Sequence, residues 1–194
     1  IGGGIGIVYE DSLASGDPTW WENSDALTPE EYAAKLVPSL KPLGLKIILE
    51  PGRYMVGNAG VLLTEVIYEK QGTTKLFKII DAGMNDLIRP TLYEGHHDIV
   101  PLQEAAAGGE TEVVDVVGPV CESGDYFAKD REIAKVEEGD VIAVLSAGAY
   151  GFVMASNYNS RPFPAEILVD GDTAHVIRQR QSMDDLIAGE SIVE

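Results

Sequence analysis

The later two thirds of the chain are divided into short runs rich in β-branched and aromatic residues, and this pattern limits the possible folds more than any other feature. Turn-forming residues separate the runs 62–69, 75–81, 98–102, 111–117, 140–146, 165–169 and 175–180. Short strands at this spacing are typical of a mostly antiparallel sandwich or barrel. Asp170-Gly171 predicts a hairpin between the last two runs. Ser182 is placed to cap a short closing helix.

The first 58 residues follow a different pattern of helix, strand and charged turn. Thr28 and Glu31 have the spacing of a capping box, and the apolar residues after them predict a helix with one buried face. The apolar run 45–49 that follows is typical of a buried strand. We therefore expect residues 1–58 to be the end of an α/β barrel or sheet, and residues 59–194 to be a separate β domain.

Composition excludes several classes of partner. The formal charge of the 194-residue chain is −18, and its basic residues form no cluster, which argues against nucleic acid and against an anionic membrane surface. No apolar stretch is long enough to span a bilayer, and the single cysteine, Cys121, cannot form an internal disulfide. We expect a soluble protein of the reducing cytoplasm. The chain begins at Ile1 without a methionine, so we also expect a fragment.

The predicted strand 45–49 ends in Glu50-Pro51-Gly52-Arg53, an acid, a rigid turn and a base. Ligands of parallel α/β sheets bind beyond the carboxyl ends of the strands. Pro51 fixes the turn, Gly52 lets the backbone approach a ligand, and Arg53 offers a five-donor fork for phosphate or carboxylate. The alternative is an exposed turn with an ordinary ion pair.

The glycine-rich segment 2–6 is a second candidate, because bare backbone amides can converge on an anion. It does not match the dinucleotide-binding fingerprint, whose third glycine would fall at position 7, where the chain has Ile7. A flexible turn is the alternative. Residues 9–27 are polar and rich in turn formers, and they predict a long loop.

Four predicted loops of the β domain carry reactive or charged residues, namely 81–93 (DAGMNDLIRPTLY), 118–125 (GPVCESGD), 148–151 (GAYG) and 156–162 (SNYNSRP). With the glycine segment and the turn at Glu50, their order and spacing resemble the diaminopimelate decarboxylases of the alanine-racemase-like decarboxylase group. The resemblance covers essentially the whole chain and corresponds to the carboxyl-terminal part of such an enzyme. It implies the end of a (β/α)8 barrel that binds pyridoxal 5'-phosphate, then a β domain, in a head-to-tail homodimer with active sites at the subunit interface.

The resemblance assigns to the cofactor Gly2, Gly3, Gly4, Glu50, Pro51, Gly52, Arg53 and Tyr150. Amides, a guanidinium and a phenol are suitable donors to a phosphate group. The resemblance also implies that Glu50 opposes the pyridine nitrogen, where a carboxylate favours the protonated, electron-accepting ring.

For the substrate, the resemblance assigns Arg53, Arg89, Tyr93, Glu122 and Tyr150. Cys121 of the neighbouring subunit would return a proton to the carbon that has lost CO2, and Glu122 would bind the distal ammonium group. A buried, inert side chain is the alternative for Cys121, although its loop setting argues against this. Acidic Glu122 beside it favours the protonated thiol, which suits a proton donor.

Arg89 separates the possible substrates. Diaminopimelate has an amino-acid group at both ends, so its distal end needs a cation for the carboxylate, and the resemblance gives this role to Arg89 and Tyr93 with Arg53. The product would be L-lysine. A surface arginine paired with Asp86 is the alternative.

Two further alternatives concern the whole protein. The family's Schiff-base lysine lies in an early barrel strand, and none of the eight lysines here matches it, so this chain alone is not expected to complete the reaction. A decarboxylase of ornithine, arginine or carboxynorspermidine would share the cofactor residues. A non-catalytic regulatory relative would retain only the β domain.

Two remaining clusters are interpreted as structural. Two adjacent histidines, His96 and His97, point apart on a strand and lack a third nitrogen ligand, so we expect solvated loop residues and no metal site. Asn157, Tyr158 and Arg161 are expected to support the surrounding loops.

Overall fold

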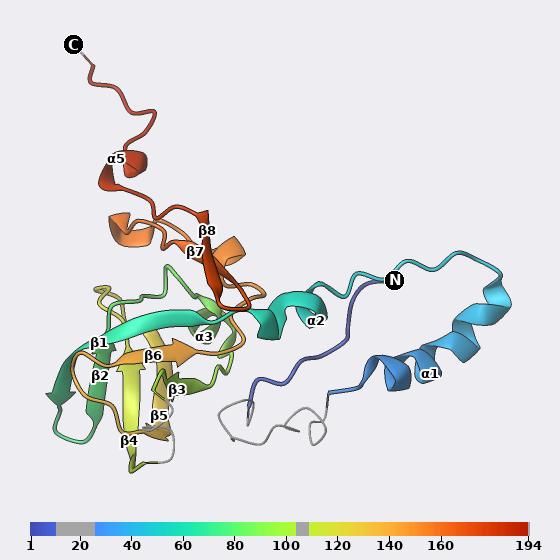
Figure 1. Ribbon diagram of the computed structural model, residues 1–194, viewed down its shortest axis with the longest axis horizontal. Coiled ribbons are helices and arrows are strands. Elements are labelled where there is room, and N and C mark those ends of the chain that lie inside the picture. Colours follow the sequence, from blue (N-terminus) through green and yellow to red (C-terminus); the bar gives the residue numbers. More distant parts are fainter. Residues whose placement is uncertain (11–25, 104–108, 194) are drawn as a thin grey trace.

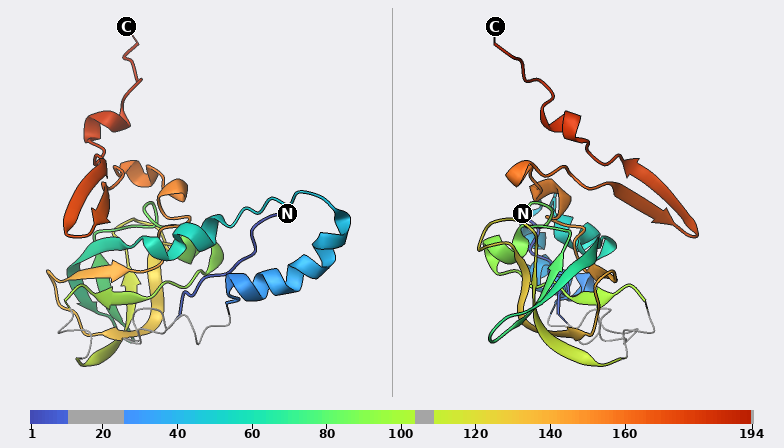
Figure 2. Two further views of the ribbon diagram at one scale, coloured as in Figure 1. Left: turned by 45° about the vertical axis from the view of Figure 1, so that its right-hand side comes forward. Right: turned by 90° about the vertical axis from the view of Figure 1, so that its left-hand side faces the viewer.

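The computed structural model describes residues 1–10, 26–103 and 109–193 (Figure 1). A β domain forms the main body of the molecule, at the lower left of Figure 1. The helix α1 and the extended segments beside it lie on one side of this domain, and a hairpin followed by a short helix projects from another (Figures 1 and 2). The predicted loop 9–27 lies mostly outside the described residues.

Six strands form the sheet of the β domain, in the order β3-β6-β1-β2-β4-β5. They are β1 (Leu62–Gln71), β2 (Leu76–Ile80), β3 (Ile99–Pro101), β4 (Thr111–Val117), β5 (Tyr126–Ala134) and β6 (Val141–Val144). Among these described strands, β2 and β4 pair in parallel and the other pairs are antiparallel. Arg131 of β5 donates to the carbonyl of His97 just before β3 (3.1 Å), so the two edges of the sheet approach each other. The predicted mostly antiparallel β domain is confirmed.

The curled sheet encloses an apolar core, because successive residues of a strand point to opposite faces. The core consists of Val66, Ile80, Ala82, Leu87, Ile99, Val114, Val116, Phe127, Ala128, Ile133, Val136, Ile142 and Val144. Burying a large apolar side chain contributes about 1.5–3 kcal/mol relative to leaving it exposed. The core therefore gives the loops at its rim a rigid base.

Strand β5 is absent from the sequence prediction, and a bulge explains why. Its register against β4 shifts between Val114 and Val116, and Asp130 has a positive φ of 46°. Lys129 and Asp130 are exposed there. The buried carboxylate of Asp115 accepts a hydrogen bond from the Asp130 amide (2.7 Å). Charged residues that a bulge turns to solvent interrupt the apolar alternation on which strand prediction rests.

Helix α1 (Pro29–Leu40) begins as predicted. Thr28 Oγ1 accepts from the amide of Glu31 (3.2 Å), and Glu31 accepts from the amide of Thr28 (2.9 Å). A 3-10 turn, η2 (Lys41–Leu43), continues the helix to Gly44, whose φ is 61°. The predicted buried face is wrong, since no residue of α1 is buried. Among the described residues, few chain segments lie against this helix (Figure 1).

The predicted buried strand at 45–49 is also wrong. These residues form no strand, and Leu45 and Ile48 are 70% and 65% exposed. A strand buried on both faces needs neighbouring strands and covering helices. The described neighbour on this segment is the start of the chain, where the amino group of Ile1 donates to the Ile48 carbonyl (3.1 Å).

The connecting elements complete the fold. The short helix α2 (Gly52–Val56) and the 3-10 turn η3 (Gly57–Ala59) lead into β1, and α3 (Arg89–Tyr93) follows β2. The turns η4 (Phe152–Met154) and η5 (Tyr158–Ser160) precede the C-terminal hairpin. Among the described residues, no helix is both long and apolar enough to cross a membrane.

The predicted C-terminal hairpin and helix are confirmed. Strands β7 (Glu166–Asp170) and β8 (Thr173–Arg178) pair in antiparallel fashion, with Gly171 at a φ of 56° in the turn. The helix α5 (Met183–Leu186) is capped by Ser182.

Candidate functional site

The glycine segment lies against the turn at Glu50. The Ile1–Ile48 hydrogen bond and the approach of Gly3 to Glu50 have the same sequence offset, so the two segments run parallel. A Cβ atom on Gly3 would lie 2.5 Å from the Glu50 carbonyl oxygen, a distance that only glycine avoids. The Tyr32 hydroxyl donates to the Gly3 carbonyl (2.7 Å).

The loop of Tyr150 packs against the same region. The amide of Gly148 donates to the Gly57 carbonyl (3.0 Å), and a Cβ atom on Gly148 would overlap the carbonyl of Val56 at the end of α2. Tyr150 has a φ of 62°, which is uncommon for a residue with a side chain and is concentrated at functional sites. The structure thus places residues 2–4 against the turn 50–53, and residues 148–151 against the far end of the helix α2 that this turn begins. We call residues 2–4, 50–53 and 148–151 the cofactor-side cluster.

Three polar groups of the cofactor-side cluster are available to a ligand. Glu50 and Tyr150 are exposed, and Arg53 is half-buried. Within the described part of the chain, the carboxylate of Glu50, the guanidinium of Arg53 and the hydroxyl of Tyr150 form no ion pair or side-chain hydrogen bond. The ordinary ion pair considered for the turn at Glu50 is therefore not seen there.

The Cys121 loop is held by a buried acid. Asp125 accepts hydrogen bonds from the amides of Met84 and Val120, both at 2.6 Å. Burial raises the pKa of Asp125, although the two amides act in the opposite direction. Cys121 itself is exposed, so a buried, inert thiol is excluded. Glu122 is also exposed, and its Oε1 accepts from the amide of Gly124 (3.2 Å).

Helix α3 joins the Cys121 loop to Arg89. The Thr91 hydroxyl donates to the Gly124 carbonyl, and the Tyr126 hydroxyl donates to the Pro90 carbonyl (3.2 Å). Tyr93, at the end of α3, is 62% exposed. We call α3 together with residues 118–125 the substrate-side cluster. No hydrogen bond or ion pair between described residues joins Cys121 or Glu122 to the cofactor-side cluster.

Arg89 is buried rather than on the surface. It is 8% exposed, its Nη1 donates to Nε2 of His97 (2.7 Å), and its Cζ lies 4.5 Å from the centre of the Tyr9 ring. The alternative of a surface arginine paired with Asp86 is wrong, because the arginine near Asp86 is Arg161 (3.9 Å). Among the described residues, no carboxylate lies within ion-pair distance of Arg89.

Both histidines were predicted to be solvated, and this is wrong for His97. His96 is partly exposed and lies 2.8 Å from Asp98, whereas His97 is fully buried. A sequence signal was available, since His97 and Ile99 share one face of an alternating strand that leads into the core. No group of three or more potential ligands for a metal ion occurs within the described residues.

Arg161 and Asn157 support the loops, as predicted. Arg161 donates to Asn85 Oδ1 (2.9 Å) and to the Asp81 carbonyl (2.5 Å), which fixes the segment before α3. Asn157 donates to the Arg161 carbonyl (2.8 Å).

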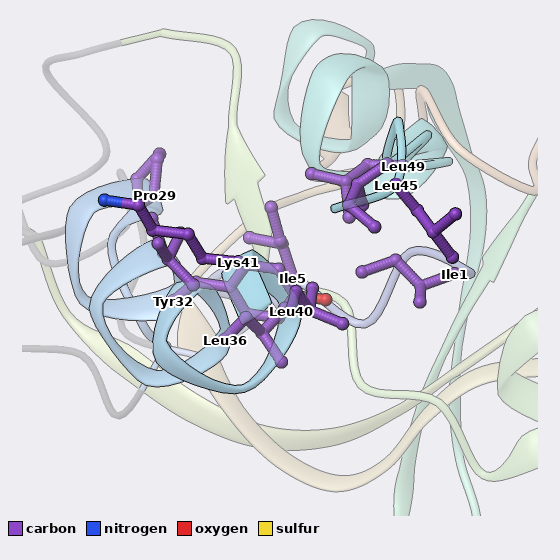
Figure 3. Close-up of a pocket in the computed structure, with 12 residues that line it drawn as sticks. Ile1, Ile5, Pro29, Tyr32, Leu36, Leu40, Lys41, Leu45 and Leu49 are labelled. Carbon is purple, nitrogen blue, oxygen red and sulfur yellow. The ribbon is translucent and has the colours of Figure 1, made fainter. Parts of the chain in front are cut away.

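A separate apolar hollow of about 370 Å³ lies between α1, residues 45–49 and the start of the chain (Figure 3). Its walls include Ile5, Leu36, Leu40 and Leu49. Its lining is mostly apolar, with Tyr32 and Lys41 as its polar members, and none of the predicted site residues lines it, so it is not the candidate site.

The rim of the β domain thus carries an exposed thiol, exposed acids and a buried guanidinium. Residues 7–148 match the family described as pyridoxal-dependent decarboxylase, C-terminal sheet domain. The chain belongs to this family. The family and the pyridoxal cofactor expected from the sequence are thereby confirmed.

Curated relatives narrow the comparison. The chain is 46% identical to the diaminopimelate decarboxylase of Vibrio cholerae over 194 residues, which are 100% of this chain and 43% of the relative. It is 46% identical to the diaminopimelate decarboxylase of Aquifex aeolicus over 96% of this chain and 41% of that protein. The chain thus spans less than half the length of these curated relatives.

Solved structures agree with the sequence comparison. The crystal structure of AQ1208 from Aquifex aeolicus is similar with a TM-score of 0.85 and 44% identity, over 96% of this chain and 43% of that one. Diaminopimelate decarboxylase from Helicobacter pylori, crystallised with L-lysine, gives a TM-score of 0.82 and 43% identity over the same shares.

Proposed function

We propose that the protein carrying this chain decarboxylates meso-2,6-diaminopimelate to L-lysine and CO2, with pyridoxal phosphate as cofactor. One observation carries the choice of substrate: Arg89 is a buried cation without a carboxylate partner among the described residues. A buried charge is normally paired, because burial without a partner is costly. A ligand carboxylate at the distal end of the substrate would supply the missing anion. Diaminopimelate has that carboxylate, whereas ornithine does not.

The relatives support the same substrate. The curated proteins at 46% identity are named diaminopimelate decarboxylases, and the Helicobacter pylori structure is titled as a complex with L-lysine, the expected product. A lysine/ornithine decarboxylase from Vibrio vulnificus has 20% identity and a TM-score of 0.66, which indicates a shared fold alone.

The cofactor-side cluster fits a phosphate group. Gly3 leaves no room for a side chain beside Glu50, and Arg53 and Tyr150 have donors without described partners. In the proposal, Gly2, Gly3, Gly4 and Arg53 bind the phosphate, Tyr150 donates to cofactor or substrate, and Glu50, on the turn with Pro51 and Gly52, opposes the pyridine nitrogen. When bound, pyridoxal phosphate supplies a ring that accepts the electron pair released as CO2 leaves.

The substrate-side cluster provides the proton and the distal contacts. Cys121 is exposed at the tip of a loop that Asp125 fixes, so its thiol can reach beyond its own domain. We assign it the proton that replaces the carboxylate of the substrate. Glu122 would hold the distal ammonium group, while Arg89 and Tyr93 would hold the distal carboxylate with Arg53.

A homodimer with shared sites is part of the proposal. Within one chain, no described hydrogen bond or ion pair links Cys121 or Glu122 to the cofactor-side cluster. A second copy could bring its Cys121 loop to that cluster, as the head-to-tail arrangement of the family implies. We also propose a cytoplasmic location, which the single exposed cysteine favours.

The domain boundary near residue 58 is a proposal as well. It is supported by the parallel course of residues 1–3 and 48–50, as in adjacent strands of a (β/α)8 barrel, and by the start of the sheet at Leu62.

A comparison of four amino-acid substrates tests the proposal. CO2 release by the complete protein is measured with meso-diaminopimelate, L-ornithine, L-arginine and carboxynorspermidine, for the unchanged protein and for Arg89→Ala. We expect diaminopimelate to be preferred, and Arg89→Ala to lower its kcat/KM by about tenfold or more. Arg180→Ala, at an exposed arginine, is the matched control. A preference for ornithine would refute the assigned substrate, and no CO2 release from any substrate would favour a regulatory role.

A further inference from the structure

His97 was not among the predicted site residues, yet it touches Arg89 directly. It has no exposed surface and lies between Arg89 and the end of β6. Its Nδ1 is 2.7 Å from the Leu145 carbonyl oxygen, and its Nε2 is 2.7 Å from Nη1 of Arg89. A carbonyl only accepts and a guanidinium only donates. His97 must therefore carry its proton on Nδ1 and present the bare Nε2 to Arg89.

Other residues hold Arg89 in the same orientation. The Tyr9 ring lies below the guanidinium at 4.5 Å, and it meets the His97 ring edge to face, with centres 5.5 Å apart and planes at 83°. On another side, a Cβ atom on Gly95 would lie 3.4 Å from both Cζ and Nη2 of Arg89. The guanidinium is thus confined, with N–H groups that have no other described partner.

Because His97 is a neutral acceptor, it leaves the positive charge of Arg89 available to a ligand, which an acidic residue would not do. A carboxylate at position 97 would orient Arg89 but also cancel its charge, so that the pair would attract a further anion only weakly. Neutral imidazole orients the guanidinium and leaves its positive charge in place. Burial lowers the pKa of His97 to about 4; the bond to the Leu145 carbonyl opposes this shift, and the Arg89 charge adds to it.

We propose that His97 is a positioning residue, which aims the buried Arg89 guanidinium at the distal carboxylate of the substrate without neutralising it. The inference rests on the proposed function, because it takes a carboxylate as the ligand of Arg89. A purely structural histidine would fill the same space, and the two roles differ in what a replacement without an acceptor does to ligand affinity.

The test uses the complete, cofactor-loaded protein and measures L-lysine binding by calorimetry, cofactor retention by absorbance, and kcat and KM for meso-diaminopimelate. His97→Leu removes the acceptor at similar volume, and His97→Gln keeps a neutral oxygen acceptor. We expect His97→Leu to weaken lysine binding and raise KM by about tenfold, as for a lost hydrogen bond to a charged group, with kcat and cofactor retention little changed. His97→Gln should restore most of the affinity. His96→Leu is the matched control.

Arg89→Met separates failure of this inference from failure of the proposed function. Native lysine affinity in His97→Leu, with lost affinity in Arg89→Met, would overturn the positioning role and keep the proposed site. Native affinity in Arg89→Met would instead overturn the carboxylate site itself. If His97→Leu does not fold, nitrogen NMR of the unchanged protein decides: we expect a protonated Nδ1 and a bare Nε2 near neutral pH, and the opposite tautomer would refute the positioning role.

Discussion

The ammonium nitrogen of Lys78 lies 2.7 Å from Oε1 of Glu112, inside the β domain, where Lys78 has no exposed surface. The same nitrogen donates to the Val136 carbonyl (2.5 Å) and pairs with Glu69. These contacts use all three donors of the ammonium group. Burial acts to lower the pKa of Lys78, but the two carboxylates outweigh it and the pKa is raised. This ion cluster ties β2 to both of its neighbours in the sheet.

Removing Lys78 should strongly destabilise the β domain. Lys78→Ala leaves the carboxylate of Glu112, whose side chain is 16% exposed, without its cation. Breaking a buried ion pair on one side costs about 3–5 kcal/mol of unfolding free energy. Lys70→Ala, at an exposed lysine of β1, should change it by no more than about 0.5 kcal/mol. Urea unfolding followed by circular dichroism measures both variants, and equal midpoints would contradict the structural role of Lys78.

The sequence predicted the elements whose signals are local. The capping box at Thr28, the hairpin at Gly171 and seven strands of the two sheets depend on neighbouring residues, and the structure has them. Burial was predicted less well, because it depends on distant segments. The run 45–49 is apolar enough for a buried strand, but the described residues supply too few neighbours to bury it.

In the candidate site, too, features with a local sequence signal were predicted, whereas features that depend on the folded chain were not. Its motifs could be recognised in order along the chain, so that the loops of Cys121, Arg89 and Tyr150 could be predicted as site loops. The partner of Arg89 could not be predicted, because the contact depends on how the chain folds back against α3 after Glu94 and on the Leu145 carbonyl, just after β6, which holds the His97 ring. The adjacent polar residues suggested a solvated loop instead.

Acidification should destabilise the folded protein through His97. In the folded state its pKa is about 4, against 6.5 for an unperturbed histidine. The unfolded chain therefore takes up this proton at a higher pH, and the stabilisation present above pH 6.5 is lost as the pH falls through 6.5 towards 4. The groups around the ring are Arg89, His96 and Asp98, and none of them removes the effect of burial.

His97→Gln isolates this effect. Burial also raises the pKa values of Asp86 and Asp125, and these carboxyl groups act in the opposite direction, since the folded state gains stability as they become protonated. They are present in both proteins and cancel in the comparison. Between about pH 7 and pH 4, the unchanged protein should lose about 3 kcal/mol more unfolding free energy than His97→Gln. The unfolding free energy of both proteins is measured by urea unfolding at each pH. An equal change with pH in the two proteins would show that His97 does not titrate in this way.

Asp125→Asn should loosen the Cys121 loop. Asp125 accepts from two amides, and an asparagine can offer only one oxygen, so its NH2 group would face the amide of Met84 or Val120. A displaced proton donor should lower kcat by about ten- to a hundredfold, with less effect on KM. Asp172→Asn, in the exposed turn of the hairpin, is the control. Steady-state CO2 release distinguishes the two variants, and an unchanged kcat would mean that Asp125 does not position the thiol.

Mixed dimers should reveal which subunit provides Cys121. Cys121→Ala alone should lower kcat by about 10²–10⁴-fold, as expected when a proton donor is removed. If the sites are shared, a dimer of one Cys121→Ala chain and one Arg53→Ala chain has one intact site, built from the unchanged Arg53 of the first and the unchanged Cys121 of the second. Random pairing then restores about a quarter of the native activity.

A matched pair of variants controls the mixing experiment. Cys121→Ala and Glu122→Ala lie on the same loop, so their mixed dimer should have no intact site and should show no recovery above the separate variants. No recovery when Cys121→Ala is mixed with Arg53→Ala would mean that each site is built from a single chain. Recovery in the control would mean that Cys121 and Glu122 do not act together in one site. The exposed position of Cys121, away from the contacts that assemble the cofactor-side cluster, favours sites shared between two subunits.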